Sequence, residues 1–235
     1  MRRALCAITV LLTGLVGVGV VVPAEALSAK TVKAAQERLN RLRCHAGPVD
    51  GVAGQMTKAA TVRFQSRHRL AQTGYLNDRT RQVLHSARAN RCDVRPRPTH
   101  SGTGRRMILS QRQNWVWLVA AGGRVVAQGG LIDNPGVLDR GRYWTGPKCG
   151  RAGRIKNNSD YSGQLKLYNF VRFAPCGMGF HQVPTYRSNG RQIHPNWLLG
   201  TNYRESHGCV RVSRLMSERI WDFTVRRTKV VVVRG

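Results

Sequence analysis

Acidic residues are scarce in this sequence of 235 residues, in which 11 Asp and Glu stand against 39 Lys and Arg. The formal net charge of +28 excludes an acidic, solvating chain and makes a polyanion the natural partner. The sequence also lacks the HExxH and HxxxH patterns of helical zinc sites, and it has no zinc-finger, RNP or helix-turn-helix pattern. Positive charge alone therefore gives no support to a sequence-specific nucleic-acid reader.

Arginine supplies most of the charge, with 32 Arg against 7 Lys, and apolar residues make up 41% of the chain. A chain of this length and composition can bury one large core or two small ones, so disorder is not expected. The planar guanidinium fork binds phosphate and carboxylate groups. Nucleic acids, anionic wall polymers and acidic peptides are therefore all candidate partners, and charge does not choose among them.

The first residues have the layout of a secretory signal peptide over residues 1–26. Two arginines precede an apolar run over residues 4–22, and the small-x-small triplet 24–26 predicts cleavage before Leu27. The alternative is an uncleaved membrane anchor, although the glycines within the run make it a poor membrane span. We expect a secreted, extracytoplasmic protein that carries +27 after cleavage, meets no nucleic acid, and contacts the membrane only if the signal is retained.

Export makes disulfide bonds the expected state of the cysteines. Cys6 leaves with the signal, and five cysteines remain, at positions 44, 92, 149, 176 and 209. Because five is odd, one thiol is free or pairs with another chain. The sequence by itself allows several pairings, so the position of each cysteine in the predicted domains has to decide.

A small helical domain is predicted over residues 30–92. Apolar residues recur at helical spacing over 31–42, a second helix is predicted over 57–68, and Asp78 is a candidate cap for a third helix that runs through Leu84. Three short helices make a marginal core that usually needs a covalent tie. Cys44 follows the first helix and Cys92 follows the third, so a bridge between them would join the ends of the bundle; the alternative is two buried free thiols.

Residues 93–106 contain prolines, glycines and serine without an apolar run, which predicts a linker. After it, the pattern over residues 107–235 becomes that of a mainly β domain. Short β-rich runs occur at residues 107–109, 115–120, 124–127, 141–144, 164–173 and 229–233. One helix is predicted there over residues 213–225, with Leu215, Ile220, Trp221 and Val225 available for its buried side.

The segment SHGCVR at residues 206–211 brings together a thiol, an imidazole, a guanidinium and a glycine. A cysteine nucleophile needs a neighbouring base or cation that populates its thiolate, and backbone N–H groups that stabilise the oxyanion formed on attack. Cys209 is therefore the candidate for the odd, reactive thiol. Its base has to come from outside the segment, and His181 and His194 are the remaining histidines of this domain.

This segment, with FHQVP at residues 180–184 and LGT at 199–201, resembles the active-site signature of the L,D-transpeptidases, the YkuD-type catalytic domain. Residues 36–84, with GPVDG at 47–51, resemble the three-helix type of peptidoglycan-binding domain. Together the two resemblances imply a small all-α three-helix domain followed by a mainly β, β-sandwich-like catalytic domain.

The L,D-transpeptidase resemblance assigns roles by position. Cys209 would be the nucleophile, His181 the base, and His207 an accessory group that shapes the pocket. Arg211 would anchor the substrate or a loop, and Ser206 would help to bind the substrate. The backbone amides around Gly208 and Cys209 would form the oxyanion site.

Two points stay open. The 24 residues between His181 and Ser206 are more than in many members of the family, which leaves His194 as a rival base. An enzyme of this type cannot use an oxidised nucleophile, so we expect Cys149 to pair with Cys176 and leave Cys209 free. The alternative is that Cys149 or Cys176 captures Cys209.

The resemblance implies an exported cysteine transpeptidase that needs no cofactor. Its thiolate would attack the bond before the terminal D-alanine of a tetrapeptide stem of peptidoglycan and pass the acyl group to an amine of a neighbouring stem. Water as acceptor would make it an L,D-carboxypeptidase. Two further alternatives are a zinc-dependent wall peptidase and a non-enzymatic binder of nucleic acid or wall polymer; the candidate zinc ligands are His181, His194, His207 and Cys209.

Overall fold

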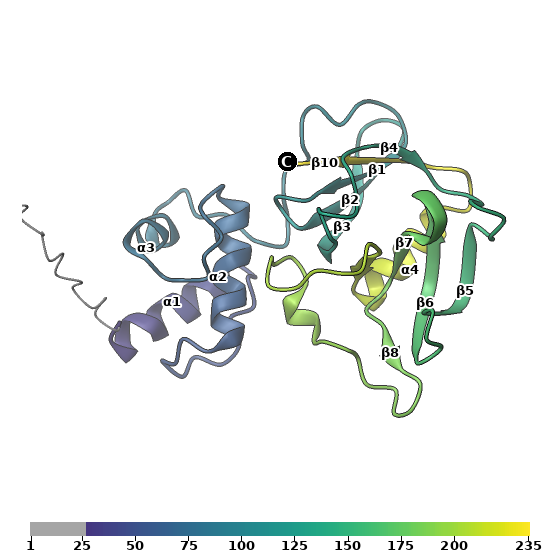
Figure 1. Cartoon of the computed structure of the whole chain (residues 1–235). Helices are drawn as coiled ribbons and strands as arrows, with labels where there is room; N and C mark the ends of the chain where they lie inside the picture. Colours follow the sequence, from purple (N-terminus) through teal and green to yellow (C-terminus); the bar gives the residue numbers. More distant parts are fainter. Residues whose placement is uncertain (1–26) are drawn as a thin grey trace, which may run out of the picture.

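The computed structural model describes residues 27–235, with the side chain of Cys176 excepted, and consists of a helical unit followed by a larger β unit (Figure 1). The predicted signal over residues 1–26 lies outside the described residues, and its cleavage stays a prediction. Within residues 27–235, no helix has both the length and the apolar character needed to cross a bilayer. The predicted fold class, helices first and a mainly β domain after them, is confirmed.

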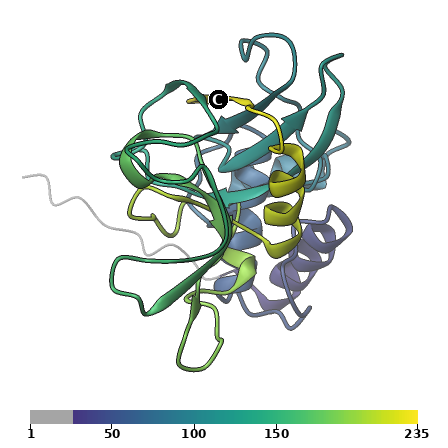
Figure 2. The same cartoon turned by 90° about the vertical axis from the view of Figure 1, so that its right-hand side faces the viewer.

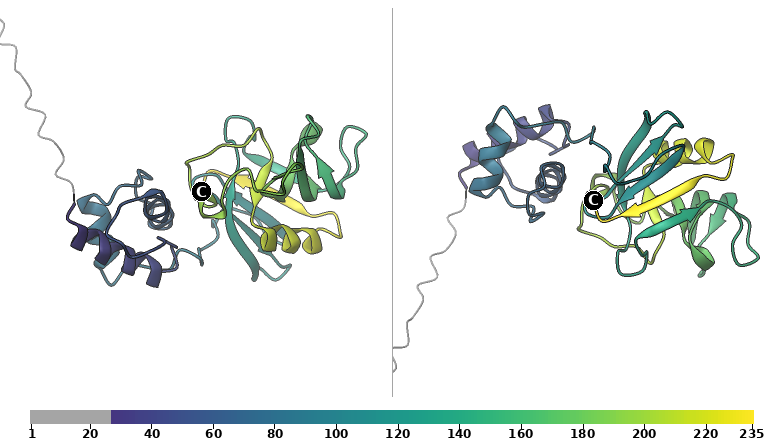
Figure 3. Two further views of the ribbon diagram at one scale, coloured as in Figure 1. Left: turned by 90° about the horizontal axis from the view of Figure 1, so that it is seen from below. Right: turned by 90° about the horizontal axis from the view of Figure 1, so that it is seen from above.

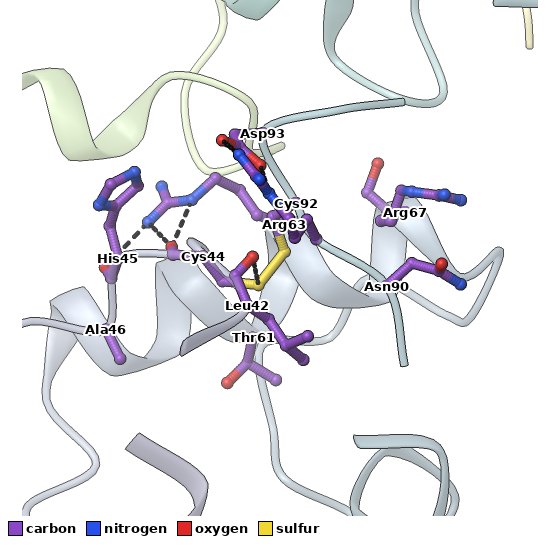
Figure 4. The surroundings of a disulfide bond; sticks show 12 residues. Leu42, Cys44, His45, Ala46, Thr61, Arg63, Arg67, Asn90, Cys92 and Asp93 are labelled. Carbon is purple, nitrogen blue, oxygen red and sulfur yellow. Dashed lines mark hydrogen bonds and ion pairs between the residues drawn. A yellow bond between two sulfur atoms is a disulfide. The ribbon is translucent and has the colours of Figure 1, made fainter. Parts of the chain in front are cut away.

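Three helices make up the helical unit: α1 (Ala29–Arg41), α2 (Gln55–Arg67) and α3 (Asp78–His85). Their apolar faces meet in one small core, which contains Ala35, Leu39, Ala60, Phe64, Leu76, Leu84 and both cysteines. The predicted disulfide between Cys44 and Cys92 is present and lies inside that core (Figure 4). It joins the chain after α1 to the chain after α3, so the ends of the bundle are covalently fixed.

The start of α3 differs by one residue from the sequence prediction. Asp78 is the first residue of the helix, and the cap is Asn77, whose side-chain Oδ1 accepts a hydrogen bond from the Thr80 backbone N–H at 2.9 Å. Asparagine and aspartate are about equally good caps, and the residue outside the helix is the one whose extended backbone aims its side chain at the third amide. Asp78 instead places its negative charge in the first turn, where the helix dipole favours it.

The β unit contains ten strands, hydrogen-bonded in the order β4-β10-β1-β2-β3-β9-β7-β6-β5, with β8 paired to β6. Figure 2 views the molecule from the side of the β unit, with the helical unit behind it. The bounds of the strands are β1 (Arg106–Ser110), β2 (Trp115–Val119), β3 (Val125–Ile132), β4 (Gly141–Trp144), β5 (Arg154–Ser159), β6 (Leu165–Arg172), β7 (Gly179–Gln182), β8 (Thr185–Tyr186), β9 (Val210–Val212) and β10 (Lys229–Val233). Two short 3₁₀ turns lie at Pro175–Gly177 and Asn196–Leu198. Four strands were not predicted: β7, β8 and β9 have only two to four residues, which carry too little periodicity, and β5 is made mostly of polar residues.

Helix α4 (Arg214–Phe223) packs against β3, β6 and β7, and its buried side differs in part from the predicted one. Ile220 is fully buried and Trp221 packs against the core, as expected. Leu215 and Val225 are instead 63% and 70% exposed, and the buried positions are Met216 and Ser217. The helix meets the sheet through one narrow side, so residues one position away from that side remain in solvent.

Buried arginines connect the two units. Figure 3 shows the two units side by side, and Figure 4 shows one of these arginines, Arg63, next to the disulfide. Arg63 of α2 donates to the Cys44 carbonyl at 2.6 Å, and its Nη1 donates to the carbonyl of Trp197 in the β unit. In the segment predicted as a linker, Arg95 is 2% exposed, donates to Ser66 at 2.9 Å and stacks over Trp115 at 4.1 Å. This segment is irregular in conformation, and it packs between the two units instead of forming a free spacer.

Candidate active site

Cys209 directly precedes β9, which runs parallel to β7. Phe180 pairs with Val210 and His181 pairs with Arg211, and both Phe180 and Val210 lie in the main core. Successive side chains of a strand point to opposite faces. His181, Arg211 and Cys209 therefore lie on the face turned away from that core.

The Cys209 thiol is free and half-buried, and its Sγ lies 3.6 Å from the carbonyl oxygen of Gly177, to which it donates. Burial raises the pKa of Cys209, and the Gly179 backbone N–H and the guanidinium groups of Arg211 and Arg172 act in the opposite direction. The net direction is upward, so the thiol is protonated at neutral pH. A reactive thiolate then requires a base.

His181 has the properties of such a base. It is 2% exposed, stacks on Phe170 at 6.1 Å between ring centroids, and its Nδ1 lies 2.6 Å from the Gln182 carbonyl oxygen. A carbonyl oxygen only accepts hydrogen bonds, so Nδ1 carries the hydrogen of the neutral ring and Nε2 keeps its free lone pair. Burial lowers the pKa of His181 to about 4, which keeps the ring neutral at physiological pH.

His194 lies in the loop between β8 and the turn at Asn196–Leu198 and is 5% exposed. Its Nδ1 lies 3.2 Å from the Pro195 carbonyl oxygen, and its buried Nε2 finds no hydrogen-bond partner among the described residues. Burial lowers the pKa of His194 as well. Both imidazoles feel the charge of Arg211, but only His181 lies on a strand that is paired with β9.

The loop before Cys209 is held by Ser206. The Ser206 side chain is buried, its Oγ accepts from the Gly208 N–H at 3.0 Å, and its backbone N–H donates to the Asp133 carbonyl at 3.1 Å. Gly208 has φ +126°, and a Cβ there would lie 3.1 Å from Val137 Cγ1, so glycine is required. The Gly208 amide thus has a hydrogen-bond partner in this structure, and the oxyanion role of the amides around Gly208 and Cys209 stays a prediction. His207 is exposed.

Two family models match the chain. The model described as a putative peptidoglycan binding domain matches residues 28–84. The model described as the L,D-transpeptidase catalytic domain matches residues 93–232, which is more than half of the chain. The chain belongs to the L,D-transpeptidase family.

Solved structures with a similar fold include an L,D-transpeptidase from Xylanimonas cellulosilytica, with 22% identity, a TM-score of 0.49, and coverage of 90% of this chain and 97% of that one. An L,D-transpeptidase from Stackebrandtia nassauensis has 18% identity, a TM-score of 0.44, and coverage of 89% and 94%. A fused Zn-dependent amidase/peptidase with a peptidoglycan-binding domain from Clostridium acetobutylicum has 17% identity, a TM-score of 0.41, and coverage of 88% and 96%. No curated protein matches the chain. The family assignment rests on the family models, because these identities and TM-scores are low.

The L,D-transpeptidase site also contains residues that the sequence analysis missed. Arg172 of β6 and the backbone of Gly177 and Gly179 all act on the Cys209 thiol. Gly179 directly precedes the Phe180-His181 pair and Gly177 lies two residues before Gly179, and glycines so close to a strand are a local signal of close backbone approach. Arg172 had no such signal, because its place beside the thiol depends on strand pairing.

The cysteine assignments are partly described. Cys149 is disulfide-bonded, as expected. The side chain of Cys176, its predicted partner, is not among the described side chains, so the pairing of Cys149 with Cys176 stays a prediction. Within the described residues, no three His, Cys, Asp or Glu side chains gather closely enough to hold a metal ion. The four side chains considered as zinc ligands are therefore not brought together.

Proposed function

We propose that this L,D-transpeptidase family member is an exported enzyme that cross-links peptidoglycan stem peptides through an acyl-enzyme on Cys209. The observation that carries the proposal is the parallel pairing of β7 with β9, which gives the free thiol a neutral, buried imidazole, His181, on the same face of the sheet. A thiol with a neighbouring neutral imidazole is the arrangement that nucleophilic acyl transfer requires.

In the first half-reaction, His181 Nε2 takes the thiol proton, and the sulfur attacks the carbonyl carbon of the bond before the terminal D-alanine. The C–N bond then breaks, and the imidazolium returns its proton to the leaving amine. The products are a thioester on Cys209 and free D-alanine. We assign the oxyanion contact to the backbone N–H of Cys209, because the Gly208 amide donates to Ser206.

In the second half-reaction, an amine of a neighbouring stem attacks the thioester. His181 takes a proton from the attacking amine and returns one to the departing sulfur, which regenerates the resting enzyme. Water as the acceptor would release the free acid through the same steps. Analysis of the products with and without an amine acceptor separates cross-linking from L,D-carboxypeptidase activity.

The experiment that tests the proposal is intact-mass spectrometry of the folded, full chain after incubation with a stem tetrapeptide. One acyl adduct per chain is expected on the wild-type protein, located at Cys209 by peptide mapping. The Cys209→Ala variant should form none. The persistence of the adduct in Cys209→Ala would overturn the cysteine mechanism.

We propose that the helical unit anchors the enzyme in the wall and that the protein acts outside the cytoplasm. The match of residues 28–84 to the peptidoglycan-binding model supports the anchoring role, and the signal layout over residues 1–26 supports export. The large excess of arginine adds a nonspecific attraction to anionic wall polymers. That attraction should weaken with salt, whereas recognition of the glycan or stem should weaken less.

A further inference from the structure

Three neighbouring strands of the β unit present their side chains in rows beside the thiol. In the antiparallel pair β6 and β7, Arg172 pairs with Gly179. In the parallel pair β7 and β9, Phe180 pairs with Val210, so the preceding residues, Gly179 and Cys209, lie next to each other. Gly179 therefore lies between Arg172 on one side and Cys209 on the other. The backbone N–H of Gly179 interacts with the Cys209 thiol, which fixes this row at the site.

The next row contains Phe170 of β6, His181 of β7 and Arg211 of β9. Phe170 stacks on His181 with 13° between the ring planes, and the Arg172 guanidinium lies 5.0 Å from the centre of the same Phe170 ring. A Cβ at position 179 would lie 2.7 Å from Phe170 Cζ, so only glycine lets this ring cover the strand. The aromatic ring thus packs against both the candidate base and Arg172.

Arg172 is buried, with 2% of its surface exposed, and no Asp or Glu among the described residues forms an ion pair with its guanidinium. Its Nε donates to the Ala152 carbonyl at 3.1 Å, and its buried Nη1 has no acceptor among the described residues. A buried guanidinium nitrogen without an acceptor is costly. Such a group is retained at little cost only if something else supplies the acceptor.

Within residues 27–235, the surroundings of Arg172 contain several cations and no carboxylate. The titratable groups that act on Arg172, Cys209 and Arg211 are Arg151, Arg204, Tyr161 and these residues themselves. The acceptor that this group of arginines lacks is therefore an anion brought by a ligand. Arginine binds a carboxylate through two parallel N–H groups, and Arg172 has a free Nη1 for that purpose.

We propose that Arg172 binds the terminal carboxylate of the acyl-donor peptide while Cys209 attacks the preceding carbonyl. The inference rests on the proposed function, because it needs a donor whose leaving residue carries a free carboxylate. In such a donor the carboxylate carbon is three bonds from the carbonyl carbon under attack. When the donor's carbonyl carbon lies at the sulfur, the carboxylate of the same donor therefore lies near the arginines around the thiol. Arg172 would select donors by their free C-terminus.

The test compares a stem tetrapeptide that ends in D-alanine with the same peptide ending in D-alaninamide, using the acylation rate of the full chain. Arg172→Gln should lower the rate for the carboxylate donor by roughly 10- to 100-fold more than the rate for the amide donor, the range of a charged hydrogen bond. A smaller loss shared by both donors would report the effect of the Arg172 charge on the Cys209 thiol. The matched control is Arg142→Gln, which removes an exposed charge on β4 and should change neither rate. Equal losses with both donors would overturn the proposal and make Arg172 a structural or thiolate-stabilising residue.

A second measurement needs neither a variant nor turnover. N-acetyl-D-alanine should protect Cys209 of the wild-type protein from alkylation by iodoacetamide, and N-acetyl-D-alaninamide should protect it at least tenfold less well. Equal protection would overturn the carboxylate site even if the Arg172→Gln protein did not fold. Selective protection without any acyl adduct from the tetrapeptide would instead support the carboxylate site and reject the proposed acyl transfer.

Discussion

The disulfide between Cys44 and Cys92 should decide whether the helical unit is folded at all. The bridge closes a loop with a sequence separation of 48, which in the chain-entropy model stabilises the native state by roughly 4 kcal/mol. A core as small as that of the helical unit rarely supplies more than about 3–5 kcal/mol. The Cys44→Ala/Cys92→Ala variant should therefore have a helical unit close to zero stability, because the loss is as large as the whole core contribution.

The assay is urea unfolding with hydrogen exchange read separately for residues 29–85 and 106–233. In the double variant, amides of α1, α2 and α3 should lose protection under native conditions, while the strands of the β unit keep theirs. Cys209→Ala is the matched control, since it removes a thiol that makes no bridge and should leave protection of the helices unchanged. A double variant that loses less than about 1 kcal/mol would refute the reasoning, because the helical core and the Arg63 contacts would then suffice without the bridge.

Three further predictions concern the base, pH and the wall. His181→Ala should slow acylation of Cys209 steeply and leave a slow reaction at alkaline pH, where the thiol ionises without help. His194→Ala should change the acylation rate little. Intact mass measures acylation of both variants, and the reverse pattern would move the base to His194. Burial lowers the pKa of His181 from 6.5 to about 4, so its contribution to stability is full above pH 6.5 and is lost as pH falls toward 4. Burial raises the pKa of Asp133 to about 6, so protonation of Asp133 adds stability over much of the same interval. Asp133→Asn should therefore make the melting temperature fall more steeply with acid than in the wild type, and an unchanged slope would contradict this. The full chain should pellet with insoluble peptidoglycan at moderate salt, and a protein that stays in the supernatant even at low salt would contradict the anchoring role.

The contacts of Arg63 connect the helical unit to the loop that leads to the active-site segment. Arg63 is buried, its pKa is lowered to about 10 by that burial, and it donates to carbonyls of both Cys44 and Trp197. On the same loop, Asn202 donates to the Gln72 carbonyl at 3.3 Å. The helical unit therefore supports the loop from 196 to 203, and the two units work as one packed body.

Local sequence determined the elements whose pattern is complete within a dozen residues. The 3.6-residue spacing of apolar residues fixed the three N-terminal helices to within about two residues at each end. Cys44 and Cys92, at the ends of that bundle, were paired correctly for the same reason. The segment 206–211 identified the free thiol Cys209, because its unusual combination of side chains is contiguous in the sequence.

Only the tertiary structure decided which distant residues surround that thiol. The charge of Arg172 acts on Cys209 because β6, β7 and β9 lie side by side, and periodicity could not predict β7 and β9, which are too short. The same pairing places His181, and not His194, on a strand next to β9; the choice of His181 as the base, which the spacing to Ser206 left open, stays a prediction. The sequence likewise did not predict that the Gly208 amide donates to Ser206 or that Leu215 is exposed. Strand pairing and burial are long-range properties, so the residues that local patterns identify acquire their neighbours only when the sheet is assembled.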